Sequence, residues 1–370
     1  MSVCADVCVI GGGPAGLAAA IALRRQGFTV TLTDCAVPPI DKTCGEGLLP
    51  DSIAALDELG VAIPSGVGFR FRGVRFTDRE SSVVADFPNG AGIGLRRTVL
   101  HNLLVERAQE VGVSFSWGTK RTRAEVAGIL VNDPMIKPGL VVGADGQNSQ
   151  IRRDVGLDQR KREVRRFGFR RHYRLRPWSA YMELHWGKRC QLYITPVSAN
   201  EISVALLSSD PKLRLDEALM NFPEIRSRLS SASPSSAQTG SLTVSRKLAR
   251  VCRPGVALIG DASGSVDAIT GEGIGLSFRQ AVALARAFKA GNLSRYERAH
   301  QVLSRRPRLM GAVLLRLGQH ERIRRRVLAN LARHPDIFGS LLAIHVGQSS
   351  FLDLCSLCLL EFGCTFLAVY

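Results

Sequence analysis

One segment near the start of the chain, residues 7–16, constrains the fold more than any other. It is a β-branched apolar run followed by glycines in the spacing Gly11-x-Gly13-x-x-Gly16. Gly11 permits a tight turn, Gly13 lets a pyrophosphate approach the backbone, and Gly16 lets helix and strand pack closely. The Ala- and Leu-rich residues 17–26 then favour a helix. The pattern predicts the strand, turn and helix of a dinucleotide-binding domain.

A second apolar run, residues 28–33, ends in Asp34, about where an acid that binds a ribose is expected. A carboxylate there accepts hydrogen bonds from ribose hydroxyls and repels a 2′-phosphate, which disfavours NADP as the occupant. The helix N-terminus offers unpaired N–H groups to phosphate. Pro14 and Ala15, which begin that helix, therefore belong to the expected site.

Composition limits the partners. The chain has 370 residues, 45% of them hydrophobic, which is enough for one large or two closely joined domains. Lys and Arg number 49 against 32 acidic residues, so the formal net charge is +17. Arginines gather in residues 152–176 and 305–326, which a solvated basic surface explains most simply. No nucleic-acid-binding motif accompanies them, so we expect no specific nucleic-acid partner.

The cysteines and the C-terminus bear on the compartment. Nine cysteines are scattered, mostly in apolar runs, which favours a reducing compartment and no metal site.

Few residues precede the first strand, so we expect no cleavable signal peptide. Residues 351–370 are apolar except for Asp353 and Glu361, which disfavours a spanning helix. We expect a cytoplasmic protein, with peripheral membrane contact through the basic C-terminal helices and the apolar tail as an open alternative.

Further along the chain, the hydrophobic pattern changes twice. Residues 140–143 and 255–261 are buried-strand patterns, whereas residues 166–207 alternate and predict an antiparallel sheet that walls a substrate cavity. Residues 120–138 are short for the strands expected there. Residues 293–346 are expected to be helical, with interruptions at Pro307 and Pro335.

Three motifs follow one another along the chain: the glycine turn, residues 143–146 with Ser149 and Arg152, and residues 260–262. In this order they resemble the motifs of the FAD-dependent oxidoreductases that include para-hydroxybenzoate hydroxylase-like monooxygenases and geranylgeranyl reductases. The resemblance implies FAD as cofactor and NAD(P)H as a transient electron donor. It places Asp261 at the ribityl chain, Arg97 at an FAD phosphate or the ribityl chain, and Asp145 and Gly146 near both FAD and the donor. The implied contacts to the flavin ring come from Gly271, Gly273 and Ile274.

The expected fold class is α/β, or α+β overall. Residues 1–160 and 250–290 form a discontinuous, Rossmann-like FAD-binding domain, and residues 161–249, with parts of 65–95, form an inserted antiparallel-sheet substrate domain. Residues 291–370 form a helical C-terminal region.

The reaction is less constrained. Residues 41–50 and 191–196 look closer to the geranylgeranyl reductase branch, and they supply the candidate catalytic residues Cys44, Glu46 and Tyr193. Because the middle motif is well kept, NAD(P)H-driven monooxygenation of a small apolar aromatic, polyketide or isoprenoid-like compound is slightly favoured. A flavin-dependent double-bond reductase or dehydrogenase is the first alternative. A non-enzymatic, basic, membrane-peripheral flavin-binding protein is the second.

Overall fold

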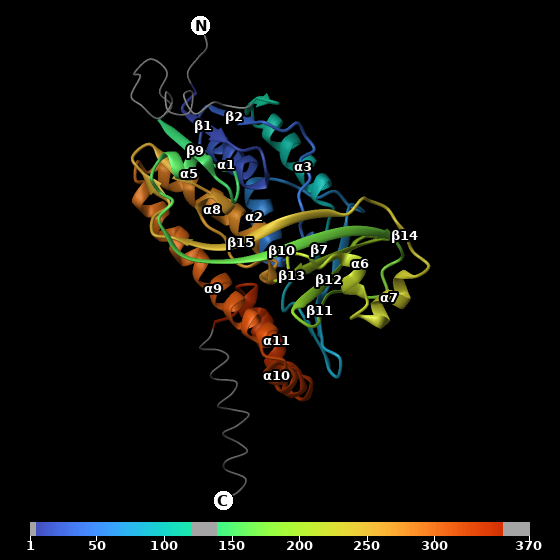
Figure 1. Ribbon diagram of the computed structural model, residues 1–370. Coiled ribbons are helices and arrows are strands. Elements are labelled where there is room, and N and C mark those ends of the chain that lie inside the picture. The colour runs from blue at the N-terminus through green and yellow to red at the C-terminus, as the bar shows by residue number, and fades with distance from the viewer. Residues whose placement is uncertain (1–4, 120–138, 351–370) are drawn as a thin grey trace, which may run out of the picture.

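The computed structural model describes residues 5–119 and 139–350. Two large sheets lie side by side, and the C-terminal helices pack beneath both (Figure 1). The predicted α/β architecture with a Rossmann-like domain is confirmed. The expectations for residues 120–138 and for the apolar tail, residues 351–370, lie outside the described residues.

The first sheet is built around the predicted opening strand. Its order is β16-β17-β9-β1-β2-β8. The parallel strands are β1 (Val7–Ile10), β2 (Val30–Asp34), β8 (Ser114–Trp117), β9 (Leu140–Gly143) and β17 (Val256–Leu258), and β16 (Cys252–Arg253) is antiparallel at the edge. Apolar strands of this kind are typical of a parallel sheet covered by helices. The covering helices α1 (Pro14–Arg25), α3 (Arg97–Glu110) and α8 (Gly273–Lys289) are in contact, α1 with both others.

The second sheet is formed mainly by the segment that was expected to be the substrate domain. Its strands are β14 (Ser233–Pro234), β10 (Arg160–Arg174), β13 (Glu201–Ser208), β12 (Cys190–Ser198), β11 (Tyr181–Trp186), β5 (Gly73–Thr77) and β6 (Ser82–Asp86), with β15 (Thr239–Leu248) beside β10. Parts of residues 65–95 do join it. The expected antiparallel pairing is confirmed for β10, β11, β12 and β13, whereas the added strand β5 pairs with β11 in parallel. These strands are distant in sequence, so no hairpin dictates their direction.

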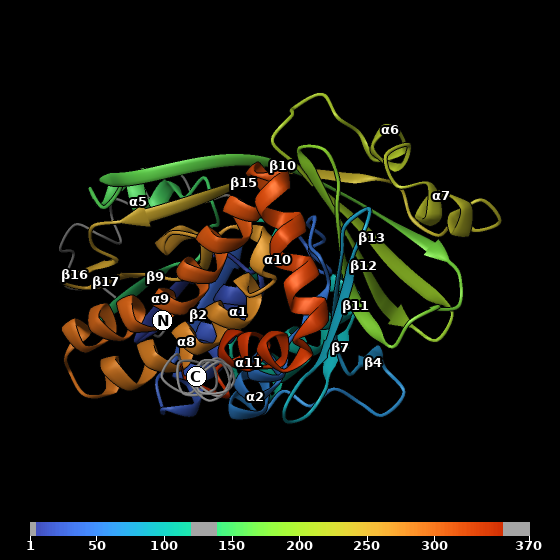
Figure 2. The same cartoon turned by 90° about the horizontal axis from the view of Figure 1, so that it is seen from below.

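Helices cover both faces of the second sheet (Figure 2). Successive side chains of β12 alternate between the faces. Leu192 and Ile194 pack with the short helices α6 (Leu215–Leu219) and α7 (Pro223–Leu229), whereas Tyr193 joins the cluster formed with the C-terminal helices. The smaller sheet of β3 (Gly47–Leu48), β7 (Gly92–Gly94) and β4 (Phe69–Phe71) lies at the junction of the two domains.

The C-terminal helices are α9 (Leu293–Gln319), α10 (Glu321–Arg333) and α11 (Pro335–His345). The expected interruption at Pro307 was wrong, because α9 continues through it. Pro307 is among the buried residues of α9, and tertiary packing of this kind can outweigh the hydrogen bond that proline removes. The chain instead breaks at His320, while the expected break before Pro335 is present.

Candidate functional site

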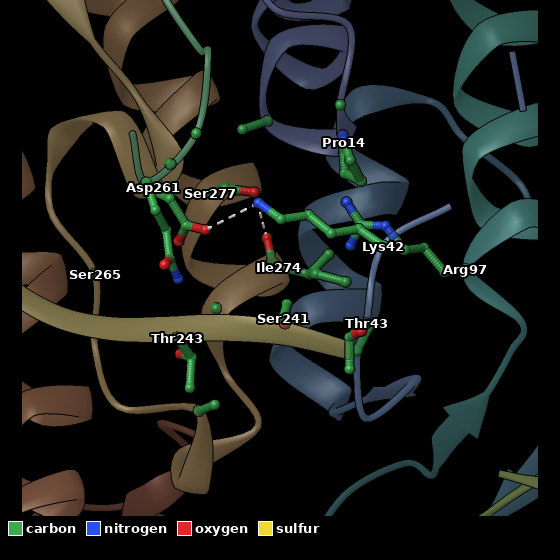
Figure 3. Close-up of a pocket in the computed structure, with 18 of the residues that line it drawn as sticks. Pro14, Lys42, Thr43, Arg97, Ser241, Thr243, Asp261, Ser265, Ile274 and Ser277 are labelled. Carbon is green, nitrogen blue, oxygen red and sulfur yellow. Dashed lines mark hydrogen bonds and ion pairs between the residues drawn. The ribbon is translucent and has the colours of Figure 1, made fainter. Parts of the chain in front are cut away.

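A cavity of about 590 Å³ lies where the carboxyl ends of β1, β2 and β9 meet the second sheet (Figure 3). Its wall includes the glycine turn, residues 42–47, the start of α8, and parts of β12, β13 and β15. This edge of an open parallel sheet is where such folds bind ligands. The cavity therefore joins the predicted cofactor site to the predicted substrate domain.

The glycine turn has the geometry that its spacing predicts. Gly11 has a φ of +113°, and a Cβ there would lie 2.3 Å from the Ala144 carbonyl oxygen. A Cβ on Gly16 would lie 1.8 Å from the Gly11 carbonyl oxygen. Gly13 differs, because a Cβ there would meet no atom within 4 Å. Gly11 and Gly16 are needed for packing, whereas Gly13 leaves open space at the N-terminus of α1, beside Pro14 and Ala15, which also line the cavity.

Asp34 and a residue that the sequence analysis missed hold the turn. Asp34 Oδ2 accepts a hydrogen bond from Gly12 N at 2.5 Å, and Oδ1 accepts one from Ala36 N at 2.8 Å. His101 of α3 donates from Nε2 to the Gly12 carbonyl oxygen at 2.9 Å. Burial and the nearby Arg97 lower the pKa of His101, so the neutral ring is favoured. His101 lies one helical turn after Arg97, which is the signal that could have identified it.

The middle motif links the distant parts of the cofactor domain. Asp145 Oδ2 accepts hydrogen bonds from Gln150 N and Ile151 N at the start of α5 (Gln150–Asp154). The buried Arg152 pairs with Asp158 at 2.7 Å and donates to the Ala262 carbonyl oxygen at 3.1 Å. Arg152 therefore fixes the motif at residues 143–146 against the one at residues 260–262.

The third motif faces the cavity. Asp261 lies in the short helix η1 (Gly260–Ser263), and its carboxylate is 4.0 Å from Lys42 Nζ, which extends across the cavity (Figure 3). Gly271, Gly273 and Ile274 line the cavity at the start of α8. A Cβ on Gly271 or Gly273 would meet nothing within 4 Å. The backbone here is open to a ligand, and the helix N-terminus favours negative charge on it.

Two unpaired polar atoms test whether FAD fits these residues. Arg97 and Asp145 line the cavity, and Arg97 Nε and Asp145 Oδ1 are buried without a hydrogen-bond partner. Buried polar atoms left unpaired are costly, and because both residues line the cavity a ligand there would supply the missing partners. Together with the open space at Gly13, Gly271 and Gly273, they fit a cofactor with phosphate and hydroxyl groups. Gly146 also lines the cavity beside Lys42.

The candidate catalytic residues lie on the cavity wall, in different settings. Cys44 is half-buried, and its sulfur accepts a hydrogen bond from Glu46 N at 3.3 Å. The hydroxyl of Tyr193 donates to the Ile269 carbonyl oxygen at 2.5 Å, and burial raises the pKa of Tyr193 well above its ordinary value. Tyr193 is therefore a neutral hydroxyl rather than a base. Catalytic roles for all three remain predictions.

Glu46 lies in a buried ionic network whose other members the sequence analysis missed. Its Oε1 accepts hydrogen bonds from Arg97 N at 2.9 Å and Arg170 Nη1 at 3.0 Å, and its Oε2 accepts one from His172 Nε2 at 2.6 Å. Arg170 also pairs with Asp41 at 2.7 Å. Residues 170 and 172 are on one face of β10, but only the pairing of the sheets brings them to Glu46.

A second buried network holds the loop before α8. Glu272 is fully buried, and Arg306 of α9 lies 3.3 Å and Arg279 3.6 Å from its Oε1. His345 of α11 lies 3.5 Å from Oε2 and donates to the Thr270 carbonyl oxygen at 3.0 Å. Burial raises the pKa of Glu272, while His345 and Arg306 oppose that rise. The C-terminal helices thus position the loop of Gly271 and Gly273.

Within residues 5–119 and 139–350, no group of His, Cys, Asp or Glu side chains has a geometry that could hold a metal ion. Over the same residues, none of the helices is both long and apolar enough to cross a bilayer.

Comparison with known proteins agrees with this geometry. The model of the FAD binding domain family matches residues 4–292. A menaquinone reductase of Mycobacterium tuberculosis is 27% identical over 90% of this chain and 92% of its own length. A putative 2-heptyl-3-hydroxy-4(1H)-quinolone synthase of Rhodococcus erythropolis is 30% identical over 75% of this chain and 78% of its own.

The fold is also found among solved structures. A geranylgeranyl bacteriochlorophyll reductase-like protein from Thermoplasma acidophilum superimposes with a TM-score of 0.71, covering 96% of each chain at 20% identity. The resemblance inferred from the three motifs is confirmed by these matches. The chain belongs to the FAD binding domain family and is an FAD-dependent oxidoreductase.

Proposed function

We propose that this flavoprotein takes electrons from NADH or NADPH and uses them to reduce a neutral, apolar, conjugated substrate of the isoprenoid-quinone class. The observation that carries the proposal is the cavity. One continuous space runs from the glycine turn to a mainly apolar wall that includes Met182, Tyr193, Ala205 and Leu207. A wall of this composition favours an apolar ring system over a charged substrate.

The ionisable groups on the substrate side support reduction over hydroxylation. Glu46 already accepts three hydrogen bonds, and Asp267 pairs with Arg166 at 3.0 Å. A hydroxylase that activates a phenol needs a base within reach of the substrate oxygen. Among the described residues of this wall, Glu46 and Asp267 are both paired, so neither carboxylate is free to act as that base. We therefore rank reduction before monooxygenation, the reverse of the preference reached from the sequence.

The relatives support both reactions to different extents. The name menaquinone reductase belongs to a relative that matches nearly the whole chain, which favours a quinone-type substrate. The quinolone synthase similarity covers less of the chain and keeps monooxygenation as the second candidate.

The residues have distinct roles in this proposal. Arg97, Asp145, Asp261 and the open backbone at Gly13 and Gly273 would hold FAD, which when bound supplies hydride transfer. The apolar wall would exclude water from the substrate ring. The network around Glu46 would keep Cys44 and its loop at the cavity. The donor nicotinamide would bind transiently, because the sequence has a single dinucleotide turn.

The test begins with the colour of the purified protein, followed by anaerobic reduction with NADH and with NADPH. The reduced protein is then mixed either with a menaquinone analogue carrying a short isoprenoid chain or with oxygen plus the same analogue. Flavin reoxidation by the analogue without oxygen, with formation of reduced product, supports the proposal. Product that forms only with oxygen and contains an added oxygen atom supports monooxygenation. A colourless protein that does not bind added FAD would overturn the proposal, whereas a flavin-containing protein that neither NADH nor NADPH reduces would support the non-enzymatic alternative.

A further inference from the structure

The outer face of α9 and α10 carries apolar side chains that the fold does not bury. Val302, Leu309 and Val313 of α9 are 60%, 48% and 47% exposed, and Ile323 of α10 is 50% exposed. The spacing of the three α9 residues places them in one line along the helix. A line of large exposed apolar side chains indicates an interaction surface.

Arginines flank this line. The exposed ones are Arg298, Arg305 and Arg316 on α9 and Arg322 and Arg326 on α10. They form no hydrogen bond or ion pair with any residue that the structure describes. The acids of the two helices are occupied elsewhere, Glu297 with the backbone of residues 251 and 252 and Glu321 with Arg325. The face therefore carries an uncompensated positive charge.

The opposite face of α9 packs against the cavity wall. A Cβ on Gly311 would lie 3.3 Å from the Thr270 side chain, and Leu314 is buried in one cluster with Tyr193 and Ile269. An α-helix with its side chains is about 10–12 Å across. The exposed face thus lies about one helix diameter from the site, on helices that Figure 2 shows in front.

We infer that this face, defined as the exposed residues 298, 302, 305, 309, 313 and 316 of α9 with 322, 323 and 326 of α10, docks on a bilayer that contains anionic lipid. Arginines bind the headgroup phosphates, and an interleaved apolar line enters the boundary between headgroups and acyl chains. A nucleic acid would also attract the arginines, but it would leave the apolar line in water. Residues 351–370, which follow α11 in the sequence, are uncharged except for Asp353 and Glu361.

The docking itself does not depend on the proposed reaction, and its test does not use activity. The full-length holoprotein is floated with vesicles of phosphatidylcholine, alone or with phosphatidylglycerol, at low and at high salt. We expect binding only to the anionic vesicles and weaker binding at high salt. The triple variant Arg298→Gln, Arg305→Gln, Arg316→Gln is expected to bind roughly a hundredfold less tightly at low salt, since each arginine near a surface contributes about a factor of five.

Two further variants distinguish binding through this face from attraction by the net positive charge of the whole protein. Val302→Ser, Leu309→Ser and Val313→Ser together change only exposed positions. This variant should bind the anionic vesicles more weakly than the unchanged protein at high salt, where the arginines contribute less. The matched control, Arg174→Gln with Arg176→Gln and Arg226→Gln, removes the same charge from exposed positions elsewhere and should bind like the unchanged protein. The inference is overturned if the control loses as much binding as the α9 arginine variant, or if the α9 arginine variant and the apolar variant both bind as tightly as the unchanged protein. It is also overturned if RNA, at the same phosphate concentration as the vesicles, displaces the protein from them.

Discussion

His172 Nε2 lies 2.6 Å from Glu46 Oε2, while the other oxygen of Glu46 accepts hydrogen bonds from Arg97 N and Arg170 Nη1. A single buried carboxylate thereby connects β10 of the second sheet to the start of α3, which covers the first sheet. Glu46 has a φ of +61°, a backbone conformation that few residues other than glycine adopt. Its contacts compensate for that strain and fix the loop that carries Cys44.

Replacing Glu46 with Ala should lower the free energy of unfolding by about 3–5 kcal/mol, because it leaves Arg170 and His172 buried with fewer partners. Glu46→Gln keeps the shape and should cost less. Urea unfolding of the two variants measures the difference. Unchanged stability of Glu46→Ala together with lost turnover would show instead that the carboxylate is catalytic.

Arg97→Ala should weaken FAD binding. The buried Nε without a partner is expected to donate to the cofactor, and a hydrogen bond from a charged group contributes about 1.5–3 kcal/mol. This corresponds to roughly 10- to 100-fold in the dissociation constant. Titration of the apoprotein with FAD, followed by flavin fluorescence, gives the value. Arg107, on the same helix, also has a buried Nε without a partner but is not among the residues that line the cavity. Arg107→Ala is therefore the control and should bind FAD normally.

Two glycines of one turn should respond differently to alanine. Gly13 has a φ of −70° and open space around it, so Gly13→Ala should fold and lose affinity for FAD. Gly16→Ala would place Cβ 1.8 Å from the Gly11 carbonyl oxygen and should unfold at lower temperature even as apoprotein. Thermal unfolding and FAD titration of both variants test this. Equal loss of stability in the two would contradict the assigned roles.

Acid should destabilise the apoprotein through His300. Burial lowers the pKa of His300 from 6.5 to about 4, and its Nε2 lies 2.9 Å from Ser263 Oγ in the turn of the third motif. Between these two values the unfolded chain binds a proton that the folded protein excludes, so stability falls as the pH is lowered through this window. The total is on the order of 3 kcal/mol. Urea unfolding of the protein and of His300→Gln across this range should show a shallower pH dependence in the variant.

The motifs that line the candidate cofactor site could be predicted from the sequence because each is local. Gly11, Asp145 and Asp261 sit at fixed positions after buried strands, and parallel strands bring their carboxyl ends to one edge. His101 was within reach of the same reasoning, since it shares a helix face with Arg97.

Other features depend on long-range pairing and could not be predicted. Arg170 and His172 meet Glu46 only because of the register between β10 and its neighbours, and β5 joins the second sheet parallel to β11. The continuity of α9 through Pro307 likewise depends on tertiary packing, which overrides the local preference of proline.

The contacts of Glu272 have a consequence for how this protein can be divided. The family model ends at residue 292, yet Arg306 and His345 beyond that point hold the loop between Gly271 and Gly273. A fragment that ends at residue 292 would contain every recognisable cofactor motif but would lack these two partners, so that Glu272 keeps Arg279 as its cationic partner beside Asp51. The C-terminal helices thus contribute contacts to this loop that the three motifs do not encode, and a fragment that ends at residue 292 is expected to bind FAD more weakly than the full chain.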